Sequence, residues 1–505
     1  MQLSPEFKEF AAAHAAGKPA LVWTSLVSDL ETPVSAMLKL ADGKPLSFLF
    51  ESVEGGAARG RYSFIGLKPD LVWRCFGDRA EINRHARSAP DRFEPQNQGA
   101  LASLRALIKE CRVATPKDLP PMAAGLFGYL GYGIVGLVEK IPDSNPDTLG
   151  IPDGLFVRPT IICIFDTIAD RVSVVTPVWP DAAVNAEQAY RAAGERIAEV
   201  LADFERSLPH RQESAGTVEE LPAPTANMTR DECMRMVATA KEYIRAGEIF
   251  QVVPSMRISV PFKLPPFALY RALRRLNPSP FLFFLDYGKF AVVGSSSEIH
   301  VRLRDGKVTI RPLAGTRRRG KDAVEDEKLA QELLADPKER AEHLMLLDLG
   351  RNDVGRVAEI GTVKVTDQFF IERYSHVMHI VSNVEGRLST KHDAVDALAA
   401  GFPAGTVSGA PKVRAMEIID ELEKEKRGLY AGSVGYFSAT GEMDTCIVLR
   451  TAMVKDGVMY VQAGAGIVAD SNPDSEQQEC VNKARALFRA AEEARRFASA
   501  ANRGQ

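Results

Sequence analysis

The feature that most constrains the fold is a series of paired apolar segments separated by short polar turns. Three such pairs are residues 160–165 with 172–178, residues 301–303 with 308–310 across Asp305-Gly306, and residues 445–454 with 458–462 across Asp456-Gly457. Asp-Gly between apolar runs is typical of a tight antiparallel hairpin, whereas parallel strands need a long crossover connection. The sequence therefore predicts sheets that are mainly antiparallel.

Segments with apolar residues at helical spacing alternate with these strands. The predicted helices cover residues 184–205, 229–246, 266–276, 323–335, 337–349, 392–400, 411–426 and 473–498. Antiparallel sheets of this size must bury their apolar faces against another layer. We therefore expect an α+β fold in which large, mainly antiparallel sheets pack in layers and are covered by helices.

The chain of 505 residues is long enough for two or three ordinary domains. Residues 206–228 are polar, contain several prolines and lack apolar periodicity, which is typical of a linker. We expect this linker to divide an N-terminal portion, residues 1–205, from a C-terminal portion, residues 229–505.

Composition excludes several classes of protein. The formal net charge is -3 and no basic stripe stands out, which argues against nucleic-acid binding. No apolar run is long enough to span a membrane, and no leader-like segment is evident, so we expect a cytoplasmic protein that binds no membrane. The six cysteines are scattered without a C-x-x-C pair, so we expect reduced thiols.

Two pairs of glutamates lie near the starts of two predicted helices. Glu339 with Glu342 follows Asp336-Pro337, and Glu476 with Glu479 follows Asn472-Pro473, and both leading sequences are typical of a helix start. Helical geometry directs Glu342 and Glu476 to the apolar face of each helix and Glu479, with Lys483, to its flank. Inward-facing carboxylates without a histidine or cysteine cluster favour a shared Mg²⁺. The same spacing also suits capping or ion-paired acids, above all at Glu339.

Glycine-rich segments do not support a nucleotide site. Residues 128–133 have the wrong glycine spacing, and no phosphate-binding G-x-x-x-x-G-K-[ST] motif occurs. The loops at residues 402–412 and 463–466 instead expose backbone N–H groups that suit a carboxylate. Arg450 ends an apolar run and suits the same kind of ligand, although such an arginine is more often a surface residue. His379 is either an ordinary strand histidine or an acid–base group.

Several segments, taken in order, resemble the chorismate-utilising enzymes. The matching stretches are residues 342–353, 403–412, 463–468 and 476–484. The resemblance covers the whole C-terminal portion and implies the chorismate-binding enzyme fold, with a magnesium site held by the two acid-bearing helices. Within this family, Ala314 and Gln251 replace lysines that are typical of aminodeoxychorismate synthases and of isochorismate and salicylate synthases. Both substitutions favour the anthranilate synthase large-subunit group.

The N-terminal portion resembles the regulatory part of that group. Residues 48–52, 60–66 and 277–281 resemble the elements that form its feedback tryptophan pocket, although Phe281 and Phe50 replace residues often found there. The resemblance implies an inhibitor site at Glu51, Ser52, Pro280, Phe281 and Leu282.

The resemblance implies conversion of chorismate and ammonia to anthranilate and pyruvate. The implied metal ligands are Glu342 and Glu479, supported by Glu339 and Glu476. The implied catalytic residues are His379, as general acid, and Thr406. The implied substrate-binding residues are Gly315, Thr316, Tyr430, Arg450, Gly464, Ala465, Gly466 and Lys483. No cysteine lies on a nucleophile-elbow pattern, so ammonia is expected from a separate glutamine amidotransferase subunit, component II, or from solution.

Three other functions fit parts of the sequence. Aminodeoxychorismate synthase component I is the nearest, and Ala314 argues against it. A non-catalytic regulatory homologue that binds tryptophan is opposed by the intact glutamates, Arg450 and Lys483. A magnesium-dependent phosphoryl-transfer enzyme is opposed by the absence of a phosphate loop.

Overall fold

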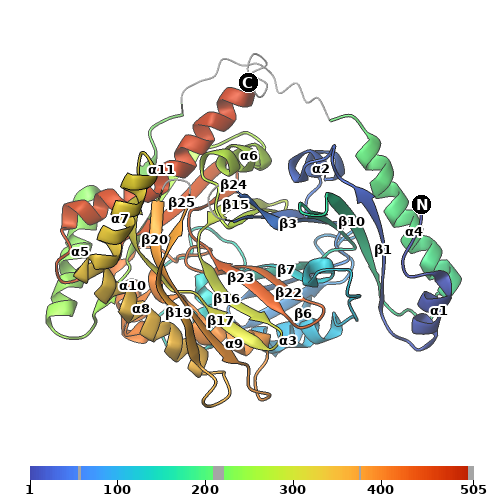
Figure 1. The fold of residues 1–505 in the computed structure, drawn as a ribbon, viewed down its shortest axis with the longest axis horizontal. Helices are drawn as coiled ribbons and strands as arrows, with labels where there is room; N and C mark the ends of the chain where they lie inside the picture. Colours follow the sequence, from blue (N-terminus) through green and yellow to red (C-terminus); the bar gives the residue numbers. More distant parts are fainter. Residues whose placement is uncertain (42, 55–57, 209–220, 375–376, 499–505) are drawn as a thin grey trace.

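The computed structural model describes residues 1–505 except 42, 55–57, 209–220, 375–376 and 499–505. Two large antiparallel sheets face each other, and helices cover their outer faces (Figure 1). This arrangement confirms the predicted α+β fold with layered sheets.

The first sheet runs through eleven strands in the described part of the chain. Their order is β1 (Ala20–Val27), β10 (Arg171–Val178), β9 (Ile161–Asp166), β3 (Ala58–Leu67), β2 (Ser47–Glu54), β14 (Phe281–Asp286), β15 (Phe290–Ser296), β24 (Thr451–Lys455), β25 (Val458–Gly464), β13 (Ser255–Pro261) and β11 (Thr225–Ala226).

The second sheet faces the first, and all its neighbouring strands are antiparallel. Its order is β18 (Leu313–Arg318), β20 (Val377–Arg387), β17 (Lys307–Ile310), β16 (Ile299–Arg304), β23 (Met443–Ile447), β22 (Ser433–Ser438), β7 (Gly125–Leu130), β8 (Gly154–Arg158), β4 (Leu71–Phe76), β5 (Arg79–Asn83) and β6 (Glu94–Gly99). Strand β19 (Lys364–Arg373) pairs with β20 outside this order, and β12 (Gln251–Val252) pairs with β21 (Gly409–Ala410).

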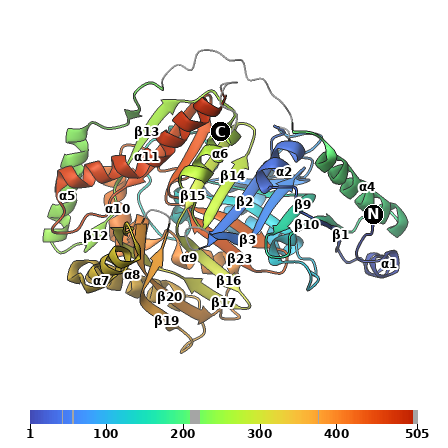
Figure 2. The same cartoon turned by 45° about the horizontal axis from the view of Figure 1, so that its top comes forward.

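The helices fall into groups by the sheet that they cover. Packed on the first sheet are α1 (Phe7–Ala15), α2 (Pro33–Leu40), α4 (Ala186–Glu205), α5 (Arg230–Arg245), α6 (Pro266–Leu276) and α11 (Pro473–Ala498). Packed on the second are α3 (Ala100–Glu110), α7 (Ala323–Ala335), α8 (Pro337–Gly355) and α9 (Ala394–Gly401). Helix α10 (Lys412–Leu422) contacts β12 and β21, and short 3-10 helices lie at η1 (Pro121–Ala123), η2 (Tyr132–Leu137) and η3 (Gly405–Val407). Figure 2 shows α11 and α6 lying over the first sheet.

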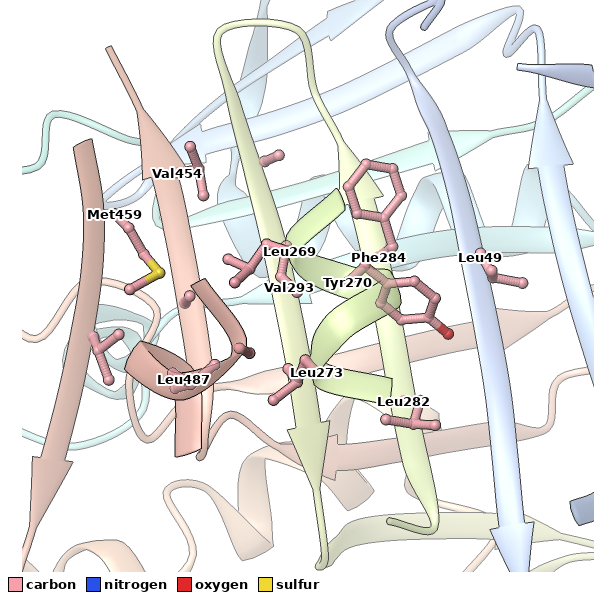
Figure 3. Close-up of a cluster of buried hydrophobic side chains, with 14 of the residues drawn as sticks. Leu49, Leu269, Tyr270, Leu273, Leu282, Phe284, Val293, Val454, Met459 and Leu487 are labelled. Atoms are coloured by element: carbon pink, nitrogen blue, oxygen red, sulfur yellow. The ribbon is translucent and has the colours of Figure 1, made fainter. Parts of the chain in front are cut away.

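Apolar residues on both faces of the central strands explain the layering. In β14, Leu282 and Phe284 pack under the helices, whereas the intervening Phe283 and Leu285 pack between the sheets. Successive strand residues point to opposite faces, so a continuous apolar run serves two cores at once. Figure 3 shows the outer core, where Leu269, Tyr270 and Leu273 of α6 lie against β14 and β15, next to Leu487 of α11.

Each portion of the chain contributes a block of neighbouring strands to both sheets. The blocks meet where β2 pairs with β14 in the first sheet and where β7 pairs with β22 in the second. Both portions therefore share both sheets. Of the predicted linker, residues 209–220 lie outside the described residues, and Thr225–Ala226 forms strand β11 at the edge of the first sheet. The assignment of a regulatory role to residues 1–205 and a catalytic role to residues 229–505 remains a prediction.

Two adjacent strand pairs pass from one sheet to the other at the same place. Strands β15 and β24 pair in the first sheet, and their continuations β16 and β23 pair in the second. We call the connecting residues, 297–298 and 448–450, the sheet crossing. The strand predicted over residues 445–454 is therefore wrong as a single element, because it breaks between Ile447 and Thr451. Strands often change sheets through such a bend.

Other boundaries differ from the prediction by a few residues. Helix α8 continues to Gly355 rather than ending at 349, and α10 ends at Leu422 rather than 426. Within the described residues, no helix combines the length and the apolar character needed to cross a membrane.

Candidate active site between the helix starts and the sheet crossing

Helix α8 begins as the sequence predicts and presents Glu342 one turn further on. Asp336 Oδ1 accepts hydrogen bonds from the N–H groups of Lys338 and Glu339, at 3.0 and 3.3 Å. Gln251 Nε2 donates to Glu342 Oε1 at 3.0 Å. Burial raises the pKa of Glu342, and the charges of Glu339 and Glu479 raise it further. Glu342 is therefore a half-buried carboxyl group that lies near two other acidic side chains, Glu339 and Glu479.

Helix α11 brings Glu479 to the same place. Asn472 Oδ1 accepts from the N–H groups of Asp474 and Ser475, at 3.0 and 3.1 Å, which caps the helix. Glu479 pairs with Lys483 at 2.8 Å, and Lys483 Nζ also donates to Gly464 O at 2.9 Å. The charge of Glu479 acts on the Glu342 carboxyl group, so the starts of α8 and α11 lie near each other. Lys483 ties α11 to the end of β25.

The two supporting glutamates have different partners. Glu339 accepts from Arg317 NH1 at 2.9 Å, so it is an ion-paired residue at this helix start. Burial raises the pKa of Glu476, a hydrogen bond from Ser471 opposes this, and the charge of Glu479 adds to it. We call these four residues the glutamate cluster: Glu339, Glu342, Glu476 and Glu479. In the part of the chain that the structure describes, no three histidine, cysteine, aspartate or glutamate side chains form a ready-made metal site.

His379 lies on β20 and is almost fully buried. Its Nδ1 is 2.9 Å from Gly315 O and 3.1 Å from Thr316 Oγ1. A carbonyl oxygen can only accept, so Nδ1 carries the proton and Nε2 holds the lone pair in the neutral ring. Burial lowers the pKa of His379 to about 4, and the positive charges of Arg450 and Lys483 contribute to this. The free protein therefore holds a neutral imidazole at neutral pH.

Gly315 needs its glycine at this position. Its φ of +72° lies in the left-handed region, and an added Cβ would come within 3.1 Å of Glu339 Oε2. Gly315 and Thr316 therefore place the backbone of β18 between His379 and the glutamate cluster, and two of the predicted substrate-binding residues lie beside the predicted acid.

Arg450 occupies the sheet crossing. It has a φ of +48°, which is uncommon for a residue with a side chain, and its guanidinium NH1 donates to Ser297 Oγ. Its charge acts on His379 and on Glu298, so its guanidinium lies near both. Arg450 is half-buried and its guanidinium is held by Ser297, so it is not a freely exposed surface side chain.

Glu298 is a candidate site residue that sequence reasoning missed. It follows Ser297 in the sheet crossing and accepts a hydrogen bond from Thr406 Oγ1 at 2.9 Å. Burial raises the pKa of Glu298, whereas Arg450, Thr406 and Lys483 oppose that shift. The sequence signal is weak: an acidic residue that follows Ser295-Ser296-Ser297, a short distance after the apolar run at residues 290–293.

The glycine loop after β25 makes close backbone contacts. A Cβ on Gly464 would lie 2.7 Å from Pro254 O and 2.9 Å from the Tyr430 hydroxyl oxygen, and one on Gly466 would lie 2.8 Å from Gln251 Nε2. Ala465 N–H donates to Pro254 O at 3.2 Å, so that donor is already used. The loop lies against Glu342 and Tyr430, but it does not offer every N–H to a ligand.

A buried ion pair fixes the segments that carry Thr406 and Tyr430. Arg427 and Glu423 are 2.6 Å apart and both buried. Arg427 also donates to Val407 O at 2.7 Å and to Val253 O at 2.6 Å. One guanidinium therefore connects three chain segments that surround the site.

The predicted inhibitor residues line one cavity between the sheets. The cavity has a volume of about 730 Å³, and its wall includes all five of them: Glu51, Ser52, Pro280, Phe281 and Leu282. Ser297 and Glu298 also lie in its wall, so this cavity ends at the sheet crossing. The Glu51 carboxylate forms an ion pair with Arg274 and accepts a hydrogen bond from the Tyr270 hydroxyl. Glu51 is therefore held in place as a fixed part of the cavity wall.

Comparisons with known proteins agree on one family. The family model described as chorismate binding enzyme matches residues 57–489. A curated relative from Cereibacter sphaeroides, anthranilate synthase component 1, is 56% identical over 498 residues, which cover 99% of each chain. A relative of the same name from Pseudomonas aeruginosa is 48% identical and covers 92% of this chain and 94% of its own.

Solved structures give the same result for the fold. Anthranilate synthase component I from Streptococcus pneumoniae superimposes with a TM-score of 0.75 at 37% identity, covering 85% of this chain and 92% of that one. The menaquinone-specific isochorismate synthase from Escherichia coli superimposes with a TM-score of 0.68 at 20% identity, covering 96% and 98%, which shows the shared fold alone.

Proposed function

Because the chain belongs to the chorismate-binding enzymes, and within them to the anthranilate synthase component 1 proteins, we propose that it converts chorismate and ammonia to anthranilate, pyruvate and water. This reaction is a carbon–oxygen lyase reaction of tryptophan biosynthesis, and we place it in the cytoplasm. The observation that carries the proposal is the pairing of two opposite charge environments in one site. The glutamate cluster supplies the negative charge. The positive charge comes from Lys483, which pairs with Glu479, and from Arg450, whose charge acts on His379 together with that of Lys483.

Substrate binding requires partners for two carboxylates. Arg450 offers a planar guanidinium whose remaining N–H groups suit a bidentate contact with the enolpyruvyl carboxylate. Lys483 adds a second positive charge next to Gly464. Gly315, Thr316 and Tyr430 border the space in which the ring would be held.

Glu342 and Glu479 would hold Mg²⁺ facing the ring carboxylate. Two carboxylates with further oxygens from the substrate and water are the usual magnesium environment. The buried Oε1 of Gln251 has no partner, which places another hard oxygen donor beside Glu342. When bound, the ion would neutralise carboxylate charge and orient the ring.

Two groups are able to handle protons. The leaving ring hydroxyl needs a proton, and loss of the enolpyruvyl group needs removal of a ring proton so that the aromatic ring forms. Glu298, with its raised pKa and its hydrogen bond from Thr406, suits one transfer. His379 suits the other, and a bound dianion would favour the protonated imidazole that a general acid requires.

The name of the relatives, component 1, implies a partner component. We propose a separate glutamine amidotransferase subunit, component II, as the source of ammonia. We also propose that tryptophan occupies the cavity between the sheets as a feedback inhibitor, because that cavity reaches Ser297 and Glu298.

The test is incubation of the purified chain with chorismate, Mg²⁺ and either ammonium or glutamine. We expect anthranilate fluorescence and an equal amount of pyruvate with ammonium, and neither with glutamine. An aminated product without pyruvate would instead indicate an aminodeoxychorismate synthase, and no consumption of chorismate would indicate a non-catalytic homologue.

A further inference from the structure

The sheet crossing holds Arg450 from two directions. The N–H of Ser295, at the end of β15, donates to Arg450 O at 3.2 Å. At the other end of the residue, the guanidinium NH1 donates to Ser297 Oγ. The backbone and the side chain of Arg450 are therefore both attached to residues 295–297.

The contact with Ser297 is the one that can set the direction of the guanidinium. Ser297 is 8% exposed, and its position is fixed on both sides by paired strands. Among the described residues, the Ser297 hydroxyl is the hydrogen-bond acceptor that the Arg450 side chain contacts. A long arginine side chain without such a contact would sample several rotamers.

The left-handed backbone of Arg450 strengthens this argument. Its φ of +48° is held by the crossing, and its side chain reaches Ser297 and lies near Glu298. Because NH1 is used by Ser297, the Nε and NH2 edge of the fork remains for a planar anion. Fixing one edge of the guanidinium presents the other edge in a single orientation.

We infer that Ser297 is a positioning residue that orients the Arg450 guanidinium for a substrate carboxylate. The inference rests on the proposed function, since the carboxylate is that of chorismate. Ser297 itself touches Arg450 and lines the cavity between the sheets. It acts on substrate through the arginine.

The test compares Ser297→Ala, Ser297→Thr and a matched control. In Ser297→Ala we expect KM for chorismate to rise about 10-fold, the effect of one lost charge-assisted hydrogen bond, with kcat nearly unchanged. Ser297→Thr keeps the hydroxyl and should restore KM. The control is Ser103→Ala, because Ser103 is also buried and also accepts a single N–H, from Trp73 Nε1 at 3.1 Å, on a distant helix.

Each outcome decides the inference. An unchanged KM in Ser297→Ala, or an equal rise in Ser103→Ala, would overturn it while leaving the proposed function intact, since the wild type still makes anthranilate. Failure of threonine to restore KM would also overturn it, provided that thermal unfolding shows a folded variant. A wild-type chain that makes no anthranilate would remove the proposed function and this inference together.

Discussion

Glu342 and Glu479 come from the starts of two different helices, yet the charge of Glu479 raises the pKa of Glu342. Such an influence requires the two carboxylates to lie near each other in a partly desolvated space. Gln251 donates a hydrogen bond to Glu342, and Lys483 forms an ion pair with Glu479. Like charges held together at this cost suggest that a cation or a cationic group belongs between them.

Removing either carboxylate should abolish metal-dependent turnover. We expect Glu342→Gln and Glu479→Gln each to lower kcat/KM for chorismate on the order of 100-fold or more, because each change removes a metal ligand. The measurement is anthranilate formation as Mg²⁺ is titrated at fixed chorismate and ammonium.

Asp348→Asn is the matched control for these two variants. Asp348 lies on the same helix, α8, but its side chain is 73% exposed and pairs with Arg351. It should keep the wild-type dependence on Mg²⁺. If a Glu342→Gln or Glu479→Gln variant also kept that dependence, the proposed metal site would be wrong.

The hydrogen bond from Gln251 should set the acid limit of metal binding. Burial raises the pKa of Glu342, and the Gln251 N–H groups lower it. Protons compete with the metal, so Mg²⁺ affinity falls as pH drops through this raised pKa. Gln251→Leu removes the donor, so the fall should begin at higher pH, as the KM for Mg²⁺ measured against pH would show.

Gln331→Leu provides the comparison for that prediction. Gln331 donates to Glu327 at 3.3 Å in the same kind of amide–carboxylate contact, on the exposed face of α7. Its pH dependence should match the wild type. A Gln251→Leu profile that coincided with the wild type would show that the hydrogen bond does not control Glu342.

Tryptophan inhibition should depend on the aromatic wall of the cavity between the sheets. Phe281 lines this cavity, whose volume of about 730 Å³ lies within the range of small-molecule sites. We expect Phe281→Ala to raise the inhibition constant of tryptophan at least about 10-fold, because a ring contact is lost, with kcat little changed. The measurement is anthranilate formation against tryptophan concentration.

Phe267→Ala is the control on the other face of the same sheet. Phe267 belongs to helix α6, packs on Tyr270 of the same helix and on Phe284 of β14, and lies outside the cavity wall. Inhibition should stay as in the wild type. Equal loss of inhibition in both variants would indicate general destabilisation, and no change in Phe281→Ala would exclude this cavity as the tryptophan site.

Local sequence signals predicted the parts of the site that depend on neighbouring residues. Asp336 and Asn472 cap their helices as expected, so the register of Glu342 and Glu479 could be inferred from helical spacing. The hairpin at Asp456-Gly457 likewise forms between β24 and β25. In each case one short segment contains all the interactions that decide its shape.

The sheet crossing could not be predicted in the same way. The break between β23 and β24 is decided by pairing with β15 and β16, residues far away in the chain. Without those partners, residues 445–454 look like one apolar strand, and Arg450 looks like a surface residue within it. Glu298 was missed for the same reason. What marks it as a site residue is its hydrogen bond from Thr406 and its proximity to Arg450, and both residues are distant in the sequence.

The buried pair of Arg427 and Glu423 should stabilise both the fold and the site. Arg427→Met leaves Glu423 buried without its charge partner and removes donors to two carbonyl oxygens, which should cost about 3–5 kcal/mol of unfolding free energy. Lys328→Met is the control, because Lys328 pairs with Glu332 at the same i,i+4 spacing but on the surface, where the loss should stay below about 1 kcal/mol. Urea unfolding measures both. Similar losses in the two variants would contradict a special role for the buried pair, because only Arg427 is buried and also holds two carbonyl oxygens.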